Sequence, residues 1–365
     1  MKNSFKIRWA PPSLGTNEEK IVQKVMKSGW LSQGKITEQF EKKMCQITNS
    51  KFAIAVNNGT SALICTLIAH NIGKNDEVIL PSFTFVATVN AVIAVGAKPI
   101  LVDCDPFTFN TTPEQMEKKI TKKTKAIIPV DVSGIPVDIY AFRKFAKENN
   151  LILIEDAAEA LGGEYKNKKI GSFGHSTIFS FHMAKIVTGV EGGIITTDNK
   201  EIARKAKLIR SHGDLGGYNS ICFGLNFRIS DIHSAIALEQ VKKLEQYLEH
   251  RNQLAKIYKE ELNEFKFQEI PNYVTLHPFM LFGLLLNPKI RNKVNQFLNN
   301  NGVETRICWR PIHLQKYFLK NKKYNLPFSE QIFSKIINLP MGNGLSEEDV
   351  KKVSIITKKA IKNFN

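Results

Sequence analysis

The sequence predicts an α/β protein with a mostly parallel central sheet that is covered by helices on both faces. Short apolar runs without polar alternation recur through the first half of the chain, and helical patterns separate most of them. Strands that are buried on both faces have this composition, and their alternation with helices indicates parallel pairing. The predicted strands are Phe52–Val56, Glu77–Leu80, Pro99–Val102, Ala126–Val132, Leu151–Ile154, Thr177–Phe181 and Gly193–Thr197.

Two helices are expected before the first strand. Thr16 and Glu19 have the spacing of a capping box, and the apolar stripe behind them ends at Gly29. A turn follows, and a second helix is expected over about 36–47. Further helices are expected between the strands, at Ser61–His70, Phe85–Val95, Pro113–Ile120 and Asp138–Glu148.

The length of 365 residues favours one large and one smaller domain. A long helix over about 231–256 is expected to connect them. We therefore predict a large domain over residues 1–244 and a smaller C-terminal α+β domain over residues 245–365.

Composition excludes several classes of protein. No run of 18 apolar residues occurs, and the first 15 residues lack an apolar signal core, so we expect a cytoplasmic protein without a membrane span. The five cysteines and eight histidines show no metal-ligand spacing, so no metal is expected. The net charge of +17 is spread along the chain, which favours a lysine-rich composition as its cause, although the charge is also compatible with an anionic ligand.

The stretch Ser176–Asp198 carries one lysine, Lys185, in a Gly-rich connection between two predicted strands. A buried lysine can lose its proton and attack carbonyl groups, and the Schiff-base lysine of pyridoxal phosphate (PLP) enzymes is the usual case. Most lysines are solvated surface charges, so this stretch alone leaves both interpretations open.

Other polar residues follow predicted strands. Gly59, Thr60 and Ser61 open a helix, as in a phosphate site or an ordinary N-cap. Asp156 ends an apolar strand, where it could bind a pyridinium N–H or begin a helix. Ser180 could touch a phosphate. One of the aromatic residues Phe83 and Phe85 could stack on a ring, with core packing as the alternative for each.

The order of these motifs resembles the DegT/DnrJ/EryC1/StrS family of sugar aminotransferases, which are PLP enzymes of fold type I (aspartate aminotransferase-like). The resemblance covers about residues 11–340. Its carriers are SGWLSQG (28–34), NNGTSAL (57–63), PSFTFVATVNAV (81–92), GAKPILVDCD (96–105), IEDAAEALGGEYKNKKIGSFG (154–174), FSFHMAKIVTGVEGG (179–193), GLNFRISDIHSAIALEQ (224–240) and VETRICWRPIH (303–313).

The resemblance implies roles for single residues. Lys185 matches the lysine that bonds to PLP and later moves a proton, and Asp156 matches the partner of the pyridine nitrogen. The remaining cofactor contacts implied are Gly59, Thr60 and Ser180 at the phosphate, Asn226 at the phosphate of the neighbouring subunit, Phe85 stacked on the ring, and Glu159 near the 3-hydroxyl. Candidates for substrate contact are Trp30, Ser32, Arg310 and His313. The implied active unit is a homodimer with shared sites.

The implied reaction is amination of a nucleotide-linked keto-deoxysugar, with L-glutamate as donor, for a cell-surface polysaccharide such as lipopolysaccharide O-antigen. Members that resemble perosamine synthases carry Glu where Glu159 stands, which favours amination at C4 over C3. Asp131–Gly134 and the residues after Lys185 depart from common family patterns, so the sugar stays open. Alternatives are a PLP-dependent keto-sugar dehydratase, which Lys185 argues against, and a DNA-binding regulator, for which no basic helix is found.

Overall fold

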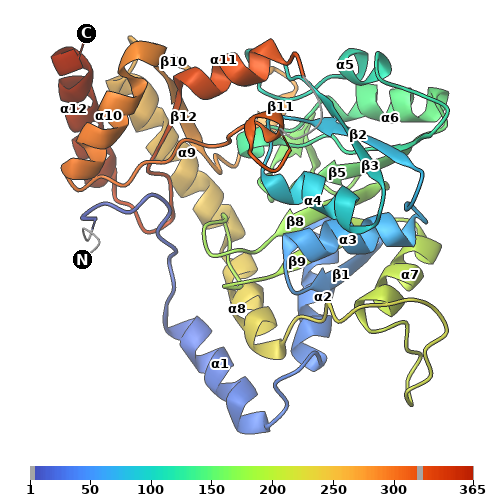
Figure 1. Ribbon diagram of the computed structural model, residues 1–365. Coiled ribbons are helices and arrows are strands. Elements are labelled where there is room, and N and C mark those ends of the chain that lie inside the picture. Colours follow the sequence, from blue (N-terminus) through green and yellow to red (C-terminus); the bar gives the residue numbers. More distant parts are fainter. Residues whose placement is uncertain (1–4, 319–323, 365) are drawn as a thin grey trace.

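The computed structural model describes residues 5–318 and 324–364. Its centre is a seven-stranded sheet with the order β1-β9-β8-β5-β4-β2-β3 (Figure 1). Every neighbouring pair is parallel except the two that β9 makes, so the predicted mostly parallel sheet is confirmed. Its strands are β1 Phe52–Val56, β2 Glu77–Pro81, β3 Lys98–Val102, β4 Thr124–Ile127, β5 Ile152–Asp156, β8 Ser176–Ser180 and β9 Gly193–Thr197.

Helices cover both faces of this sheet, and the side chains of β5 show how the faces divide. Leu153 belongs to a core with helices α2, α5, α6 and α8, whereas Ile154 belongs to a core with α3, α4 and α7. Successive strand residues point to opposite faces, so Glu155 and Asp156 also diverge. The helices are α2 Lys35–Thr48, α3 Gly59–Ala69, α4 Val86–Ala94, α5 Pro113–Glu117, α6 Ile139–Glu148, α7 Lys200–Arg210 and α8 Asp231–Lys242.

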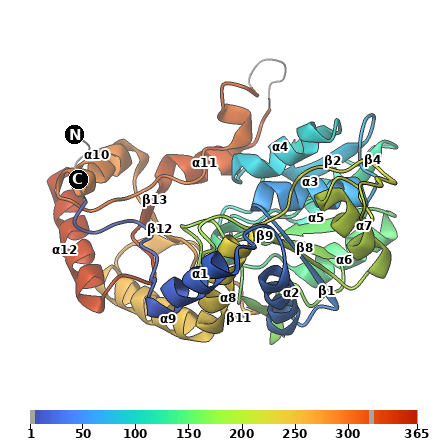
Figure 2. The same cartoon turned by 90° about the horizontal axis from the view of Figure 1, so that it is seen from below.

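The C-terminal part has its own core beside the large sheet (Figure 2). A three-stranded sheet of order β10-β12-β13 packs with the helices of this part, and Ile7 from the N-terminal segment joins the same core. The predicted division at residue 244 stays a prediction. The elements are α9 Leu244–Glu261, β10 Lys266–Phe267, β12 Phe282–Leu285, α10 Pro288–Asn300, α11 Pro327–Lys335, β13 Ile336–Leu339 and α12 Glu347–Phe364.

The long helix expected over about 231–256 is two helices, α8 and α9, that meet at Lys243. The Lys243 N–H bonds to the carbonyl of Gln240, three residues back, instead of continuing the α-helical ladder. The Lys243 amine also donates to Glu18 in α1 (Thr16–Ser28), which packs on α8. This tighter last turn ends α8, so that α9 can start in a new direction although the residues here favour a helix.

A small hairpin completes the described elements. Its strands β6 (Glu164–Tyr165) and β7 (Lys168–Lys169) pair with each other, and β6 also pairs with β11 (Val274–Leu276), which gives a third sheet. None of the helices over residues 5–318 and 324–364 has the length and apolar composition that crossing a membrane requires.

Candidate active site

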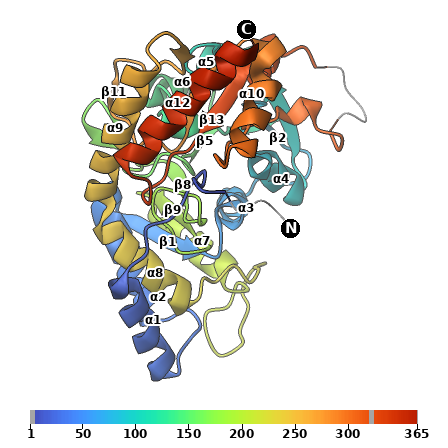
Figure 3. The same ribbon diagram turned by 90° about the vertical axis from the view of Figure 1, so that its left-hand side faces the viewer.

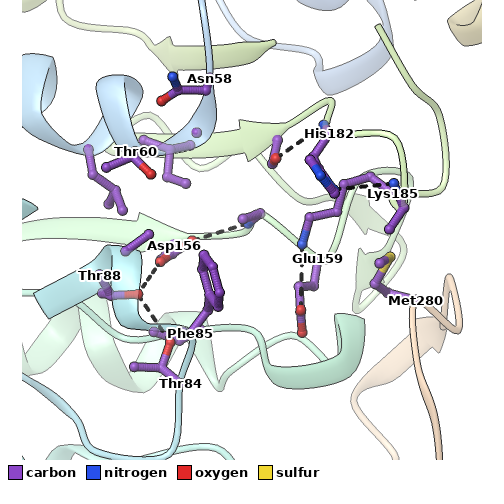
Figure 4. A pocket seen from close by; sticks show the side chains of 18 of the residues that line it. Asn58, Thr60, Thr84, Phe85, Thr88, Asp156, Glu159, His182, Lys185 and Met280 are labelled. Carbon is purple, nitrogen blue, oxygen red and sulfur yellow. Dashed lines mark hydrogen bonds and ion pairs between the residues drawn. The ribbon is translucent and has the colours of Figure 1, made fainter. Parts of the chain in front are cut away.

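A cavity of about 340 Å³ lies where β5 and β8 end and α3 and α4 begin. Ligands of parallel sheets bind beyond the carboxyl ends of the strands, so this position suits a binding site. Seven of the sequence-predicted residues line it together, namely Gly59, Thr60, Phe85, Asp156, Glu159, Ser180 and Lys185. Figure 4 shows Lys185, Glu159, Asp156 and Phe85 around the same space.

The start of α3 forms one end of the cavity. The Asn58 side chain caps this helix by accepting from Ser61 N at 2.8 Å. Gly59 and Thr60 are then the first two helical residues, whose N–H groups have no partner within the helix. A Cβ on Gly59 would approach Ser180 Cβ to 3.2 Å, so glycine lets the helix start lie against that hydroxyl. A helix N-terminus beside two hydroxyl groups is a cradle for a phosphate.

Asp156 lies at the end of β5, 4% exposed, with its carboxylate held at both oxygens. One oxygen accepts from Thr88 Oγ1 at 2.8 Å, and the other from Ala158 N at 3.3 Å. Burial raises the pKa of Asp156 to about 6, while the Thr88 hydroxyl, the Ala158 N–H and Lys185 oppose that rise. Asp156 is therefore mostly a carboxylate at neutral pH, ready to accept a hydrogen bond from a cationic N–H.

Lys185 follows β8 and pairs with an acid across the cavity. Its Nζ lies 3.5 Å from Glu159 Oε1, and the other oxygen of Glu159 accepts from Ser133 N at 2.8 Å. Ser133 adopts a left-handed conformation with φ 63°, which turns its N–H toward Glu159. The amine thus sits next to a fixed negative charge inside the cavity.

The two phenylalanines that follow β2 differ in their surroundings. Phe83 is fully buried in the core, whereas Phe85 is 52% exposed and faces the cavity. The Phe85 ring also packs on Trp309, with 5.0 Å between the ring centroids. One aromatic face is therefore available to a bound ring.

The remaining predicted residues lie outside this cavity of their own chain. Trp30 and Ser32 are exposed in the turn that Asp231 holds against α8. Arg310 lines a neighbouring cavity of about 500 Å³ that shares Phe85 and Trp309 with the first. His313 is buried between Ser82 Oγ (2.6 Å) and Glu330 Oε1 (3.2 Å), at a short helix η2 (Ile312–Leu314). Asn226 is exposed and bridges to Ser211.

Sequence reasoning assigned no role to several residues of the site, among them Thr88, Trp9 and Met280. Thr88, in the first turn of α4, supplies the hydroxyl at Asp156 and also bonds to Thr84, which lies just before the helix. Trp9 and Met280 line the cavity from distant parts of the chain, and no local pattern marks either of them.

The groups of this cavity fit PLP. A helix N-terminus with Ser180 suits its phosphate, Phe85 suits the ring, the Asp156 carboxylate suits the ring nitrogen, and Lys185 supplies an amine. A ligand with a cationic N–H is expected here, because the buried carboxylate of Asp156 faces the cavity. The individual roles remain predictions from the sequence.

Comparisons with known proteins identify the family to which this chain is similar. The model of the DegT/DnrJ/EryC1/StrS aminotransferase family matches residues 12–357. An uncharacterized protein of Methanocaldococcus jannaschii is 38% identical, over 96% of each chain. The PLP form of a candidate sugar aminotransferase from Streptococcus pneumoniae is 25% identical with a TM-score of 0.94, over 98% of this chain and 99% of that one. DesI, solved in the presence of its TDP-sugar product, is 26% identical with a TM-score of 0.91, over 99% and 94%.

Proposed function

Since this chain belongs to the DegT/DnrJ/EryC1/StrS aminotransferase family, and is thereby a PLP-dependent sugar aminotransferase, we propose that its substrate is a nucleotide-linked keto-deoxysugar. L-Glutamate is the proposed amino donor and C4 the proposed position of the new amine. The TDP-sugar product of DesI supports the substrate class, and Glu159 supports C4 through the family resemblance stated above.

One observation carries this proposal. The cavity at the ends of β5 and β8 places an amine, a buried carboxylate, an aromatic face and a helix N-terminus around one space. Each group suits a different part of PLP, and their common location is what transamination requires. When bound, PLP supplies an electron sink that stabilises negative charge on the carbon that loses its proton.

Asp156 holds the proton of the cofactor's ring nitrogen in this proposal. Its carboxylate is kept in place by Thr88 Oγ1 and Ala158 N, and both bonds favour the charged form. A fixed anion of this kind keeps a neighbouring pyridine nitrogen protonated.

Lys185 holds the cofactor and, once its amine is free, moves a proton at the substrate carbon that exchanges the amino group. Glu159 lies 3.5 Å from Lys185 Nζ and so keeps the amine pointed into the cavity between these tasks. Thr60, Ser180 and the α3 N-terminus would hold the phosphate of PLP and so restrain the bound cofactor within the cavity that Asp156 also lines.

The proposed active unit is a homodimer. Asn226 is not among the residues that line the cavity of its own chain, so a phosphate contact by Asn226 requires a second copy. The loop before Asn226 projects from the body of the protein (Figure 3). It carries four exposed apolar side chains, Leu215, Tyr218, Ile221 and Phe223, which favours burial in such an interface. The cytoplasmic location and the role in surface-polysaccharide synthesis stay predictions.

The two half-reactions test the proposal. L-Glutamate should convert the absorbance of the PLP form to that of the pyridoxamine form, and a nucleotide-linked amino sugar should do the same in the reverse direction. A panel that combines GDP, UDP and TDP carriers with 3-amino and 4-amino deoxysugars identifies the substrate. If free amino sugars react as fast as nucleotide-linked ones, the proposed substrate class is wrong; if only 3-amino sugars react, C4 is wrong.

A further inference from the structure

A buried arginine in the C-terminal part connects α9 to the loop that carries Lys185. Arg251 is 1% exposed and forms no ion pair among the described residues. Its guanidinium donates to the carbonyls of Pro278, Phe279, Met280 and Met341, at 3.2 Å each, and to Asn343 Oδ1 at 3.0 Å. A charge in the interior is stable only when donors and acceptors surround it, so these segments are held at fixed positions.

Arg251 also fixes which way the Asn343 amide faces. A guanidinium can only donate hydrogen bonds, so the oxygen of Asn343 must point toward Arg251. The nitrogen of Asn343 then points the other way, and it donates to the carbonyl of Ile186 at 2.6 Å. Ile186 is the residue directly after Lys185.

This contact holds the loop at the point where it becomes buried. His182 and Met183 are exposed, whereas Ile186, Val187 and Thr188 are 1–3% exposed. Among the described residues, Asn343 Nδ2 is the one hydrogen-bond donor to the Ile186 carbonyl. Apart from the Lys185–Glu159 ion pair, the other hydrogen bonds of the loop, such as Gly189 N to Phe181 O, remain within it or lead back to β8.

We propose that Asn343, oriented by Arg251, is a positioning residue that fixes the backbone beside Lys185 and so aims its amine into the cavity. The proposal rests on the proposed role of Lys185. It assigns to the C-terminal part a direct task at the catalytic lysine, through a donor that none of the sequence motifs contains. The same hydrogen-bonded segments carry Met280 and Trp9, which line the cavity. Arg251 donates to Met280 O, and Met341 N donates to Trp9 O.

Two substitutions at Asn343 separate positioning from simple stability. Asn343→Ala removes both bonds. Asn343→Asp keeps an acceptor for Arg251, and adds an ion pair, but loses the donor to Ile186 O. A matched control is His250→Ala, because His250 Nε2 lies 2.9 Å from Leu345 O and so contacts the same turn from α9 without touching the loop.

Hydrogen–deuterium exchange of the cofactor-free protein is the first measurement. We expect the amides of residues 186–189 to exchange about fivefold to tenfold faster in both Asn343 variants, and at the wild-type rate in His250→Ala. The Asp variant should keep its unfolding temperature. Unchanged exchange in both Asn343 variants would overturn the proposal, as would equal loosening in the His250 control.

Kinetics of the PLP-loaded enzyme form the second measurement. Misplacement of Lys185 should lower kcat for the glutamate half-reaction about tenfold, with KM changed less than about twofold. A change confined to KM contradicts positioning. Failure of wild-type protein to bind PLP would refute the proposed function instead, and the exchange experiment would still decide whether Asn343 orders the loop.

Discussion

The end of β5 carries two acids that face opposite sides of the sheet, and their surroundings differ. Asp156 faces the cavity, where Thr88 and Ala158 donate to both of its oxygens. Glu155 faces the sealed core, where His175 and Thr177 bind one oxygen and the other has no partner among the described residues. Asp131 lies next to Glu155, because Val130 pairs with Asp156 across the strands, and it too has one buried oxygen without a partner.

The difference shows that burial alone does not decide whether an acid keeps its proton. Burial raises the pKa of Asp156 only to about 6, because hydrogen bonds and Lys185 favour the charged form. Burial and the nearby Glu155 hold the pKa of Asp131 well above its usual range, with a single N–H, from Val137, in opposition. Hydrogen bonds and Lys185 thus favour the carboxylate form of Asp156 at the cavity face, whereas burial and neighbouring acids favour the protonated form of Asp131 at the core face.

The largest effect should come from the amine on the cavity face. Lys185→Ala removes the group that bonds to PLP and moves the proton, so we expect turnover to fall roughly 10²–10⁴-fold and the absorbance of covalently bound PLP to vanish. Steady-state rates and absorbance spectra check this. The exposed Lys200, when changed to Ala, should leave both unchanged. Full activity of Lys185→Ala would refute the assignment.

The second test compares the two acids of β5 directly. Asp156→Asn keeps one acceptor oxygen, for Ala158 N, and its amide nitrogen can donate to the Thr88 hydroxyl, so the fold should persist, but the neutral amide cannot keep a ring nitrogen protonated. We expect the glutamate half-reaction to slow about 100-fold or more in rapid-mixing experiments. Glu155→Gln on the core face should leave that rate within a few-fold. If the two variants slow the reaction equally, the assignment of a catalytic role to Asp156 and not to Glu155 is wrong.

The third test changes the pKa of Asp156 and follows the pH dependence of kcat/KM. Thr88→Val removes a hydrogen bond that favours the charged form, so the pKa of Asp156 should rise further above its value of about 6. The acid limb of kcat/KM should then shift upward by about one pH unit. Thr177→Val removes the equivalent hydroxyl at Glu155 and is the control. If the acid limb of kcat/KM stays at the same pH, the protonation of Asp156 does not control kcat/KM.

The smallest effect concerns stability on the core face. The pKa of Asp131 is raised in the folded state, so its contribution to stability is complete below the unfolded value of 3.8 and is lost as the pH rises toward the folded value. Asp131→Asn resembles the protonated acid and does not titrate. Its unfolding temperature should therefore exceed that of the wild type by a few degrees at pH 8, with little difference at pH 4. Calorimetry at the two pH values checks this, and equal differences at both would contradict it.

The sequence predicted the parallel sheet and the residues at strand ends, because both leave local signals. Lys185, Asp156 and Gly59 each follow an apolar strand, and parallel strands bring such positions to one edge. Thr88 was missed because its role depends on the approach of α4 to β5. Arg251 and Asn343 lie 92 positions apart, so Arg251 can orient Asn343, which contacts the Lys185 loop, only once α9 has packed. The end of α8 at Lys243 was missed because no Gly or Pro marks it in the sequence.

The position of β9 has a consequence for how the chain is made. β1 is an edge strand whose pairing partner is β9, so Phe52–Val56 has no neighbour until Gly193–Thr197 has left the ribosome. Until then the strand FAIAV presents unpaired N–H and C=O groups on an apolar segment, the kind that nucleates aggregation. Truncated chains that end before residue 193 should therefore aggregate or be degraded during synthesis, whereas chains that extend through Thr197 can pair β1 with β9.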